Sequence, residues 1–324
     1  MRLVLVGVIA AVATALAQAQ EPPGQSYPRK AVRVVAPFAP GGATDLLARL
    51  VSVKLAERWG QSVLVDNRTG AGGHIGAELA ARSPPDGYTL LVAGAPHAIG
   101  MSLYKKLGYD LAKDLAPISN LATYPSAIVV HPSLPVKTVR DLIALAKSRP
   151  HQLNFGSAGS GSPNHLAIEL FKTMAKVSMV HVPYKGGSGQ MVGDLLAGQV
   201  QLASIGLPPA MPHVKSGKLR VIAVTGSKRS PLLPEAPTVS EAGLPGFDVT
   251  SWYGMFGPAA LPRELVTRVN GDIAGVLSAA DVKERLAASG AEPAHTSPEE
   301  LGKLVREEIA KWARVVAESG ARVD

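Results

Sequence analysis

Short apolar runs alternate along the chain with amphipathic segments, and this alternation predicts strands that are each followed by a helix. In the first predicted helix, apolar residues recur at intervals of four and Gly60 then ends the pattern: Leu47, Val51, Leu55 and Trp59. Strands are predicted at 32–35, 63–65, 89–93, 127–130, 154–155, 179–182, 201–205 and 219–224. Helices are predicted from about 45 to 59 and at 75–82, 139–148, 165–176, 190–197, 262–278, 282–288 and 298–318.

This order of elements indicates the α/β class. Strands that alternate with helices form βαβ units, so we expect mainly parallel sheets. Two sets of such units occur in about 300 residues, which favours two α/β lobes over one very large sheet. Helices alone dominate the chain after residue 262.

The first nineteen residues, 1–19, are predicted to be a signal peptide. Arg2 precedes an apolar run over 3–17, and Ala17-Gln18-Ala19 provides the small-x-small pattern of a cleavage site. A run of about 15 apolar residues is shorter than the ~20 that a membrane-spanning helix needs. We therefore expect an exported protein that is not anchored in the membrane.

Composition narrows the classes of function. The 324 residues include no cysteine, which excludes thiolate catalysis, disulfide scaffolds and cysteine-ligated zinc or iron–sulfur clusters. Aromatic residues make up only 5% and no basic run occurs, so we expect no nucleic-acid partner. The formal charge of +8, from 33 Lys and Arg against 25 Asp and Glu, favours the approach of anions.

Glycine and hydroxyl residues collect in three loops, at 36–42, 156–162 and 183–189. Each loop lies between a predicted strand and a predicted helix, where unpaired backbone N–H groups and the positive end of the helix dipole meet. Such a place suits a carboxylate or a phosphate. One loop of this kind usually only turns the chain, but three in one chain favour a binding site.

No motif of an enzyme or of a cofactor site fits the chain. The 156–162 loop has the outline of a P-loop, but Ser162 stands where the phosphate-binding lysine belongs. The glycines at 70–76 do not follow a strand directly, as a dinucleotide turn requires, and neither G-x-S-x-G nor H-x-x-x-H occurs. We expect no metal and no cofactor, and an exported enzyme would need catalytic groups brought together from distant parts of the chain.

A series of short motifs follows in order from residue 35 to residue 254. They are VAPFAPGG at 35–42 with Asp45, DNR at 66–68 with GAGG at 70–73, PDGYTL at 85–90, NFGS at 154–157 with NHLA at 164–167, HVPYKG at 181–186, APTVSEAG at 236–243 and WYG at 252–254. In this order they resemble the extracytoplasmic solute receptors of tripartite tricarboxylate transporters, also called Bug-type receptors.

The resemblance implies a periplasmic binding protein of type II, with two α/β lobes and a ligand cleft between them. Lobe 1 is expected to comprise 27–123 plus 250–324, and lobe 2 to comprise 124–249. Such a receptor is not an enzyme. It is expected to work in the periplasm as a monomer, to bind a small organic acid, and to deliver it to membrane permease subunits.

The family pattern also indicates where the ligand binds, between the glycine loops of the two lobes. Backbone amides and hydroxyls are expected to hold most of it. The candidate residues are Phe38, Ala39, Gly41 and Gly42 in one wall, Ser157, Ala158, Gly159 and Ser162 in the other, and His97 and Lys185 beside them.

One departure from the family pattern bears on the ligand. Relatives often carry an acidic residue in the stretch that is Gln-Leu-Ala-Ser-Ile at 201–205 in this chain. Without that carboxylate, a counter-charge for a ligand amine is missing, so we expect a plain di-, tri- or aromatic carboxylic acid rather than an amino acid. A sensor that presents its ligand to a membrane signalling partner uses the same fold and stays an alternative.

Overall fold

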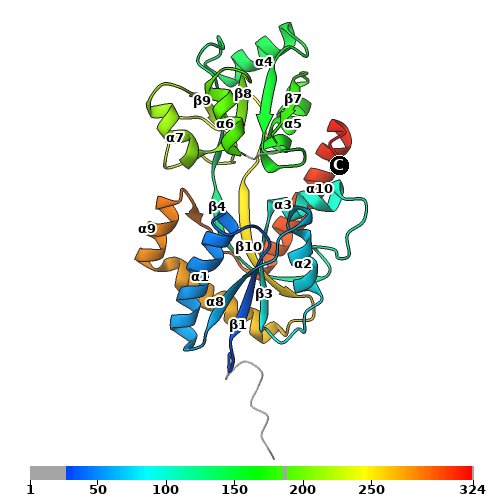
Figure 1. Cartoon of the computed structure of the whole chain (residues 1–324), viewed down its shortest axis with the longest axis vertical. Coiled ribbons are helices and arrows are strands. Elements are labelled where there is room, and N and C mark those ends of the chain that lie inside the picture. Colours follow the sequence, from blue (N-terminus) through cyan, green and yellow to red (C-terminus); the bar gives the residue numbers. More distant parts are fainter. Residues whose placement is uncertain (1–26, 185–187, 323–324) are drawn as a thin grey trace, which may run out of the picture.

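The computed structural model describes residues 27–184 and 188–322, and its strands form two separate sheets, one above the other in Figure 1. The half that carries the six-stranded sheet is called lobe 1, and the half that carries the five-stranded sheet is called lobe 2. This arrangement confirms the predicted α/β class with two lobes. The predicted signal peptide, 1–19, lies outside the described residues.

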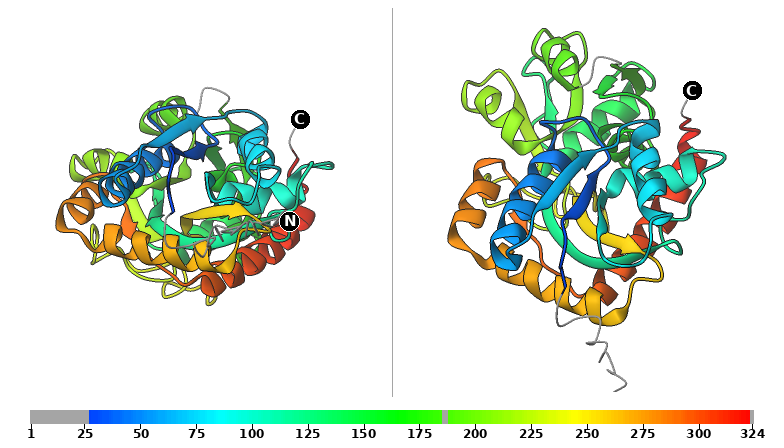
Figure 2. Two further views of the ribbon diagram at one scale, coloured as in Figure 1. Left: turned by 90° about the horizontal axis from the view of Figure 1, so that it is seen from below. Right: turned by 60° about the horizontal axis from the view of Figure 1, so that its bottom comes forward.

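Lobe 1 contains a mixed sheet with helices on both faces (Figures 1 and 2). Its strands follow the order β11 (Glu292–Pro293), β4 (Leu115–Tyr124), β10 (Ser251–Pro258), β3 (Thr89–Gly94), β1 (Val32–Ala36) and β2 (Val63–Asn67). Its helices are α1 (Ala43–Trp59), α2 (His74–Ala81), α3 (Ala95–Leu103), α8 (Arg263–Ser278), α9 (Ala280–Ala288) and α10 (Pro298–Ser319), with a short 3₁₀ turn at Ala71–Gly73.

Lobe 2 is smaller and forms the upper part of Figure 1. Its strands follow the order β7 (Val180–Pro183), β6 (Asn154–Ser157), β8 (Leu202–Gly206), β5 (Ser126–Val130) and β9 (Arg220–Val224). Its helices are α4 (Val139–Ser148), α5 (Pro163–Ala175), α6 (Ser188–Leu196) and α7 (Leu207–Lys215). No helix in the described part of the chain is both long and apolar enough to cross a membrane.

The expectation of mainly parallel sheets is wrong. Parallel pairing joins β1 to β2 and β3, and β6 to β7 and β8. The remaining pairs, β10 with β3 and β4, β11 with β4, and β5 with β8 and β9, are antiparallel. The reason is that β10 in lobe 1 and β5 in lobe 2 each lie between two strands that run the other way, and β11 adds one more antiparallel pair at the edge of lobe 1.

Two strands carry the chain between the lobes, and they lie side by side at the crossing. Strand β4 continues through Pro125 into β5, while the returning strand β10 begins with Ser251 paired to Tyr124. The fully buried Thr225 ties both crossings together: its hydroxyl lies 2.8 Å from the Val249 carbonyl oxygen and 3.2 Å from that of Ser126. The two connections are therefore adjacent and are joined by one buried hydroxyl.

Each sheet buries both of its faces, which explains the apolar runs seen in the sequence. Along β1, Val32 and Val34 face one core cluster with α1 and α8, and Val35 faces another. This second cluster extends from lobe 1 into lobe 2, where it includes Phe155 and Phe171. Residues of α10 also belong to this cluster, and α10 contacts α5, so the lobes share apolar contacts on the side of these two helices.

Candidate functional site

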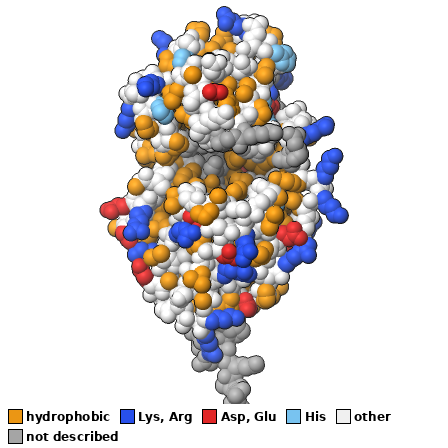
Figure 3. Space-filling view, in the orientation of Figure 1, with side chains coloured by type: hydrophobic (Ala, Val, Ile, Leu, Met, Phe, Trp, Pro, Cys, Tyr) orange, Lys and Arg blue, Asp and Glu red, His pale blue; other side chains and the backbone are white. Residues whose placement is uncertain are grey.

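A cavity of about 850 Å³ opens between the two lobes, at the crossing strands, and it appears as the hollow between them in Figure 3. Its floor includes Tyr124, Ser126 and Tyr253 from the crossings. Because burial raises the pKa of Tyr253 to about 12, that phenol stays protonated and can donate a hydrogen bond. The cavity thus combines polar donors with a partly apolar wall, as ligand sites commonly do.

Helix N-termini converge on this cavity from both lobes. Its lining includes the first turns or caps of α1 and α3 from lobe 1, and of α5, α6 and α7 from lobe 2. Lys, Arg, Asp and Glu are absent from the described lining, and the one imidazole there belongs to His213. In the described lining, backbone N–H groups and the positive ends of helix dipoles are therefore the features that favour an anion.

The first glycine loop is held in place by Asp45. The buried carboxylate accepts the Gly41 backbone N–H and the Arg49 Nε–H, both at 2.9 Å. The Asn67 amide donates to the other carboxylate oxygen at 2.9 Å and to the Phe38 carbonyl at 3.0 Å. The hydrogen bond from Arg49, together with those from the Gly41 N–H and the Asn67 amide, lowers the pKa of Asp45 to about 2, so the anchor is ionised at neutral pH.

Phe38 is supported from behind by buried imidazoles. Its ring meets His97 edge to face with 5.8 Å between centroids, and His74 lies 5.5 Å from His97 in the same manner. His97 is fully buried and accepts the Gly94 N–H at 3.2 Å. A Cβ at Gly73 would lie 3.0 Å from both Phe38 and His97, so glycine is needed there for this packing.

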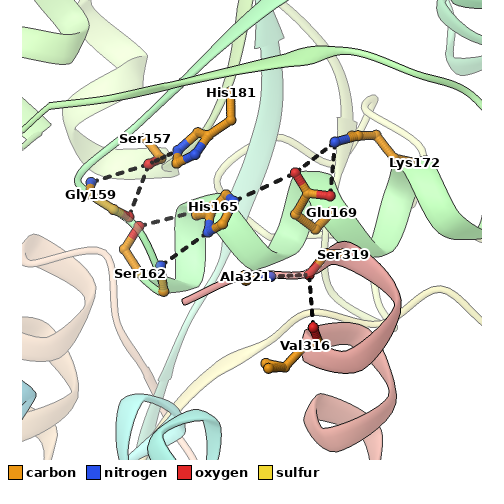
Figure 4. Close-up of polar contacts among 11 residues, drawn as sticks. Ser157, Gly159, Ser162, His165, Glu169, Lys172, His181, Val316, Ser319 and Ala321 are labelled. Atoms are coloured by element: carbon orange, nitrogen blue, oxygen red, sulfur yellow. Dashed lines mark hydrogen bonds and ion pairs between the residues drawn. The ribbon is translucent and has the colours of Figure 1, made fainter. Parts of the chain in front are cut away.

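The second glycine loop is ordered by internal hydrogen bonds (Figure 4). The Ser157 hydroxyl accepts the Gly159 N–H at 3.1 Å, lies 2.6 Å from His181 Nε2 and also faces the Gly159 carbonyl at 3.1 Å. Ser157 is fully buried and all of its hydrogen-bonding capacity is used. In this structure it shapes the loop and does not line the cavity.

A second imidazole supports the start of α5. His165 Nδ1 accepts the Gly161 N–H at 3.0 Å, so its Nε2 carries the proton and points to Glu169, 3.5 Å away. The ring stacks on His181 with 3.8 Å between centroids. Burial lowers the pKa of His181 to about 4, so the His181 ring of this stacked pair is uncharged at neutral pH. Figure 4 shows both rings.

These contacts do not form a catalytic triad. Ser157 contacts His181, but the carboxylate of Glu169 contacts the other imidazole, His165, and is also paired with Lys172 at 2.7 Å. A nucleophilic serine needs a base that is itself oriented by a third group, and it must reach the substrate. Ser157 is fully buried and does not meet the second condition.

The structure brings some of the predicted site residues to the cavity and leaves others behind it. Phe38, Gly41 and Gly42 line it, whereas Ala39 is exposed next to them and His97 is buried. The residues predicted for the second wall are not in the cavity lining themselves. The lining includes Pro163 and Asn164, which directly follow the loop that holds Ser157, Ala158, Gly159 and Ser162. Lys185 lies outside the described residues.

Several cavity residues were not predicted. Tyr124, Ser126 and Ser251 come from the crossings, and Pro208 and His213 come from α7. The Gly-Leu-Pro-Pro sequence at 206–209 indicates the start of this helix, because proline is favoured in the first turn of a helix that follows a strand.

A second cavity, of about 660 Å³, lies on lobe 2. It is lined by charges of both signs, among them Arg140 and Glu241, and no residue of lobe 1 contributes to it.

The sequence is similar to one described protein family over most of its length. Residues 47–321 match the family model described as "Tripartite tricarboxylate transporter family receptor". BugT of Bordetella pertussis is 37% identical over 300 residues, which cover 92% of each chain. A Pseudomonas protein named for the tcbD-tcbE intergenic region is 38% identical over 98% of this chain and 94% of its own.

Solved structures with the same architecture include two with a bound or added acid. A protein of R. palustris, solved with adipate, is 41% identical with a TM-score of 0.77, covering 91% of this chain and 99% of that one. MatC from Rhodopseudomonas palustris, with bound malate, is 35% identical with a TM-score of 0.74, covering 90% of this chain and 100% of that one. BugD is 32% identical with a TM-score of 0.74, covering 91% and 99%.

Proposed function

This chain belongs to the family of tripartite tricarboxylate transporter receptors, and from that premise we propose that it captures a small dicarboxylic acid between its lobes. One observation supports this most directly: N-termini of helices from both lobes line one cavity whose described lining carries no acidic side chain. A dicarboxylate has a negative group at each end, so each lobe can hold one end through backbone N–H groups.

The residues proposed to bind the acid are those of the two glycine loops and their surroundings. Phe38, Gly41 and Gly42 act from lobe 1, with Ala39 beside them. From lobe 2, the loop that includes Ala158, Gly159 and Ser162 presents the start of α5, and Lys185 adds a charge. Ser157 and His97 are proposed to act indirectly, by holding the second loop and the ring of Phe38, because both are fully buried.

The receptor is proposed to work by closure of the two lobes about the paired crossings. We place lobe 1 at 27–123 plus 250–324 and lobe 2 at 124–249, boundaries that the crossings at Pro125 and between β9 and β10 support. Closure removes water from the acid and strengthens its hydrogen bonds. A periplasmic monomer that hands the acid to membrane permease subunits, without catalysing a reaction, fits this family.

Binding of a dicarboxylate is tested by thermal shift and calorimetry with adipate, malate, citrate and glutarate. Glutamate tests whether an amino group is tolerated, and 1,6-hexanediol serves as the uncharged counterpart of adipate. A ligand at a hundred times its Kd stabilises the folded state by about 2.7 kcal/mol, so the melting temperature should rise by several degrees. If the melting temperature is unchanged by every acid, or hexanediol matches adipate, the proposed function is wrong.

Asp45→Asn is expected to weaken adipate binding about tenfold to a hundredfold, because a charge-assisted hydrogen bond to Gly41 is worth about 1.5–3 kcal/mol. The substitution keeps the size of the side chain but removes the charge that orders the loop. Glu57→Gln provides the control, since Glu57 lies on the same helix in an exposed pair with Lys54. Calorimetry measures the affinity of both variants for adipate. Equal affinities would show that the Asp45 charge is not needed to hold the glycine loop in its binding conformation.

A further inference from the structure

Gly290 and Pro208 touch across the gap between the lobes. Gly290 lies directly after the C-cap of α9 in lobe 1, and Pro208 is the second residue of α7 in lobe 2. A Cβ built on Gly290 would lie 1.7 Å from Pro208 Cγ and less than 3 Å from its Cδ and Cβ, at 2.8 and 2.9 Å. The two helix ends face each other at the left of Figure 1, and only glycine fits at this contact.

The end of α9 explains the backbone conformation of Gly290 but not its closeness to Pro208. With φ at +73°, Gly290 donates its N–H to the Ala287 carbonyl at 2.9 Å, as glycines that end helices commonly do. Gly60 and Gly320 also have positive φ values at the ends of α1 and α10, yet a Cβ at either of them would meet nothing within 4 Å. The tight fit at Gly290 is thus a property of the contact between the lobes.

The contact lies at the rim of the ligand cavity. Pro208 lines the cavity, and so does Ser289, the neighbour of Gly290. On another side the lobes meet through α5 and α10, so the cavity is bounded by contacts between the lobes at both places. A side chain at 290 would strike Pro208 and hold this rim apart.

We propose that Gly290 and Pro208 are positioning residues for ligand capture, whose direct contact sets how far the lobes close over the acid. The inference rests on the proposed function, because the contact can limit closure only if the lobes close around a ligand. A methyl group at 290 keeps the rim open, leaves part of the acid in water and speeds its release. The acid-binding residues themselves are unchanged by this substitution.

The test compares Gly290→Ala with Gly217→Ala, using adipate as the probe. Gly217 is the matched control, because its φ is +71° and a Cβ there would meet nothing within 4 Å. Both substitutions place alanine in a left-handed conformation, so the melting temperatures without ligand should fall by similar amounts. Only Gly290→Ala should raise the Kd of adipate, by tenfold or more relative to Gly217→Ala, with faster dissociation in stopped-flow measurements.

Pro208→Gly provides the rescue, since it removes all three atoms that a side chain at 290 would strike. In the Gly290→Ala background it should bring the Kd back to within about threefold of the Pro208→Gly single variant. Equal affinities of Gly290→Ala and Gly217→Ala, or a weak double variant, would overturn this inference while leaving the proposed function intact. A wild-type protein that binds none of the acids would instead overturn the proposed function, and this inference with it.

Discussion

Acidification from pH 7 to pH 4 is expected to lower the free energy of unfolding by about 6 kcal/mol through two buried histidines alone. Burial lowers the pKa of His74 to about 4 and that of His97 to about 3. Their side chains are almost inaccessible, with 3% and 0% of their surface exposed. Since domains are usually stable by about 5–15 kcal/mol, this loss brings the protein close to unfolding at pH 4.

The sign follows from where the proton binds. In the unfolded chain a histidine takes up a proton near pH 6.5, whereas in the folded protein these two remain neutral until the pH approaches 4 or 3. Between those values the unfolded state binds more protons, so stability falls as the pH falls. The stabilisation is complete above pH 6.5 and should decline by up to about 3 kcal/mol per pH unit below it.

Urea unfolding at pH 7, 6, 5 and 4.5 measures this slope. His97→Asn removes one titrating ring but keeps an acceptor for the Gly94 N–H, so it should remove about half of the part of the slope that His74 and His97 contribute. His151→Asn provides the control, because His151 is exposed and its φ of +60° is one that asparagine tolerates. A wild-type stability that stays constant between pH 6.5 and 4.5 would contradict the prediction.

The repeating part of the fold could be predicted from the sequence, and the strands that join the lobes could not. Strand β3 is a nearly continuous apolar run and β1 is apolar except for Arg33, and both lie next to clear helix signals, so the local sequence pattern is sufficient to predict them. Strand β4 contains Pro117 and Asn120, and β10 contains Gly254 and ends at Pro258, all of which weaken a strand pattern. These two strands are stabilised by pairing with each other, although more than a hundred residues of sequence separate them, so a short stretch of sequence does not contain both partners.

The site was predicted in outline because glycine loops before helices carry their own physical meaning. What the loops do with their side chains depends on distant residues. The Ser157 hydroxyl is hydrogen-bonded to His181, which lies 24 residues further along the chain. His97 is covered by Phe38 and Gly73. Helix α7, which lines the cavity, was missed because Pro212 lies inside it, although Pro208 and Pro209 stand in the first turn, where proline is favoured.

Gly94→Ala is expected to lower the free energy of unfolding by about 3 kcal/mol, because the added methyl group would meet main chain of lobe 1. Gly94 ends β3 opposite Tyr253 of β10, and a Cβ there would lie 2.3 Å from the Trp252 carbonyl oxygen. Its φ of −162° is ordinary extended backbone, so the cost is steric. Because the obstacle is main chain, β10 itself must move, and Tyr253 moves with it in the wall of the cavity.

Gly271→Ala is the control for the loss of a glycine. Gly271 lies inside α8 with nothing within 4 Å of a built Cβ, so alanine should stabilise that helix by about 0.5–1 kcal/mol. In urea unfolding, Gly94→Ala should therefore have a lower free energy of unfolding than the wild type, and Gly271→Ala a higher one. Since β10 joins the lobes, Gly94→Ala should also weaken adipate binding, whereas Gly271→Ala should leave it unchanged. If Gly94→Ala were as stable as the wild type, the close approach of β3 and β10 at the crossing could not be what holds Tyr253 in place.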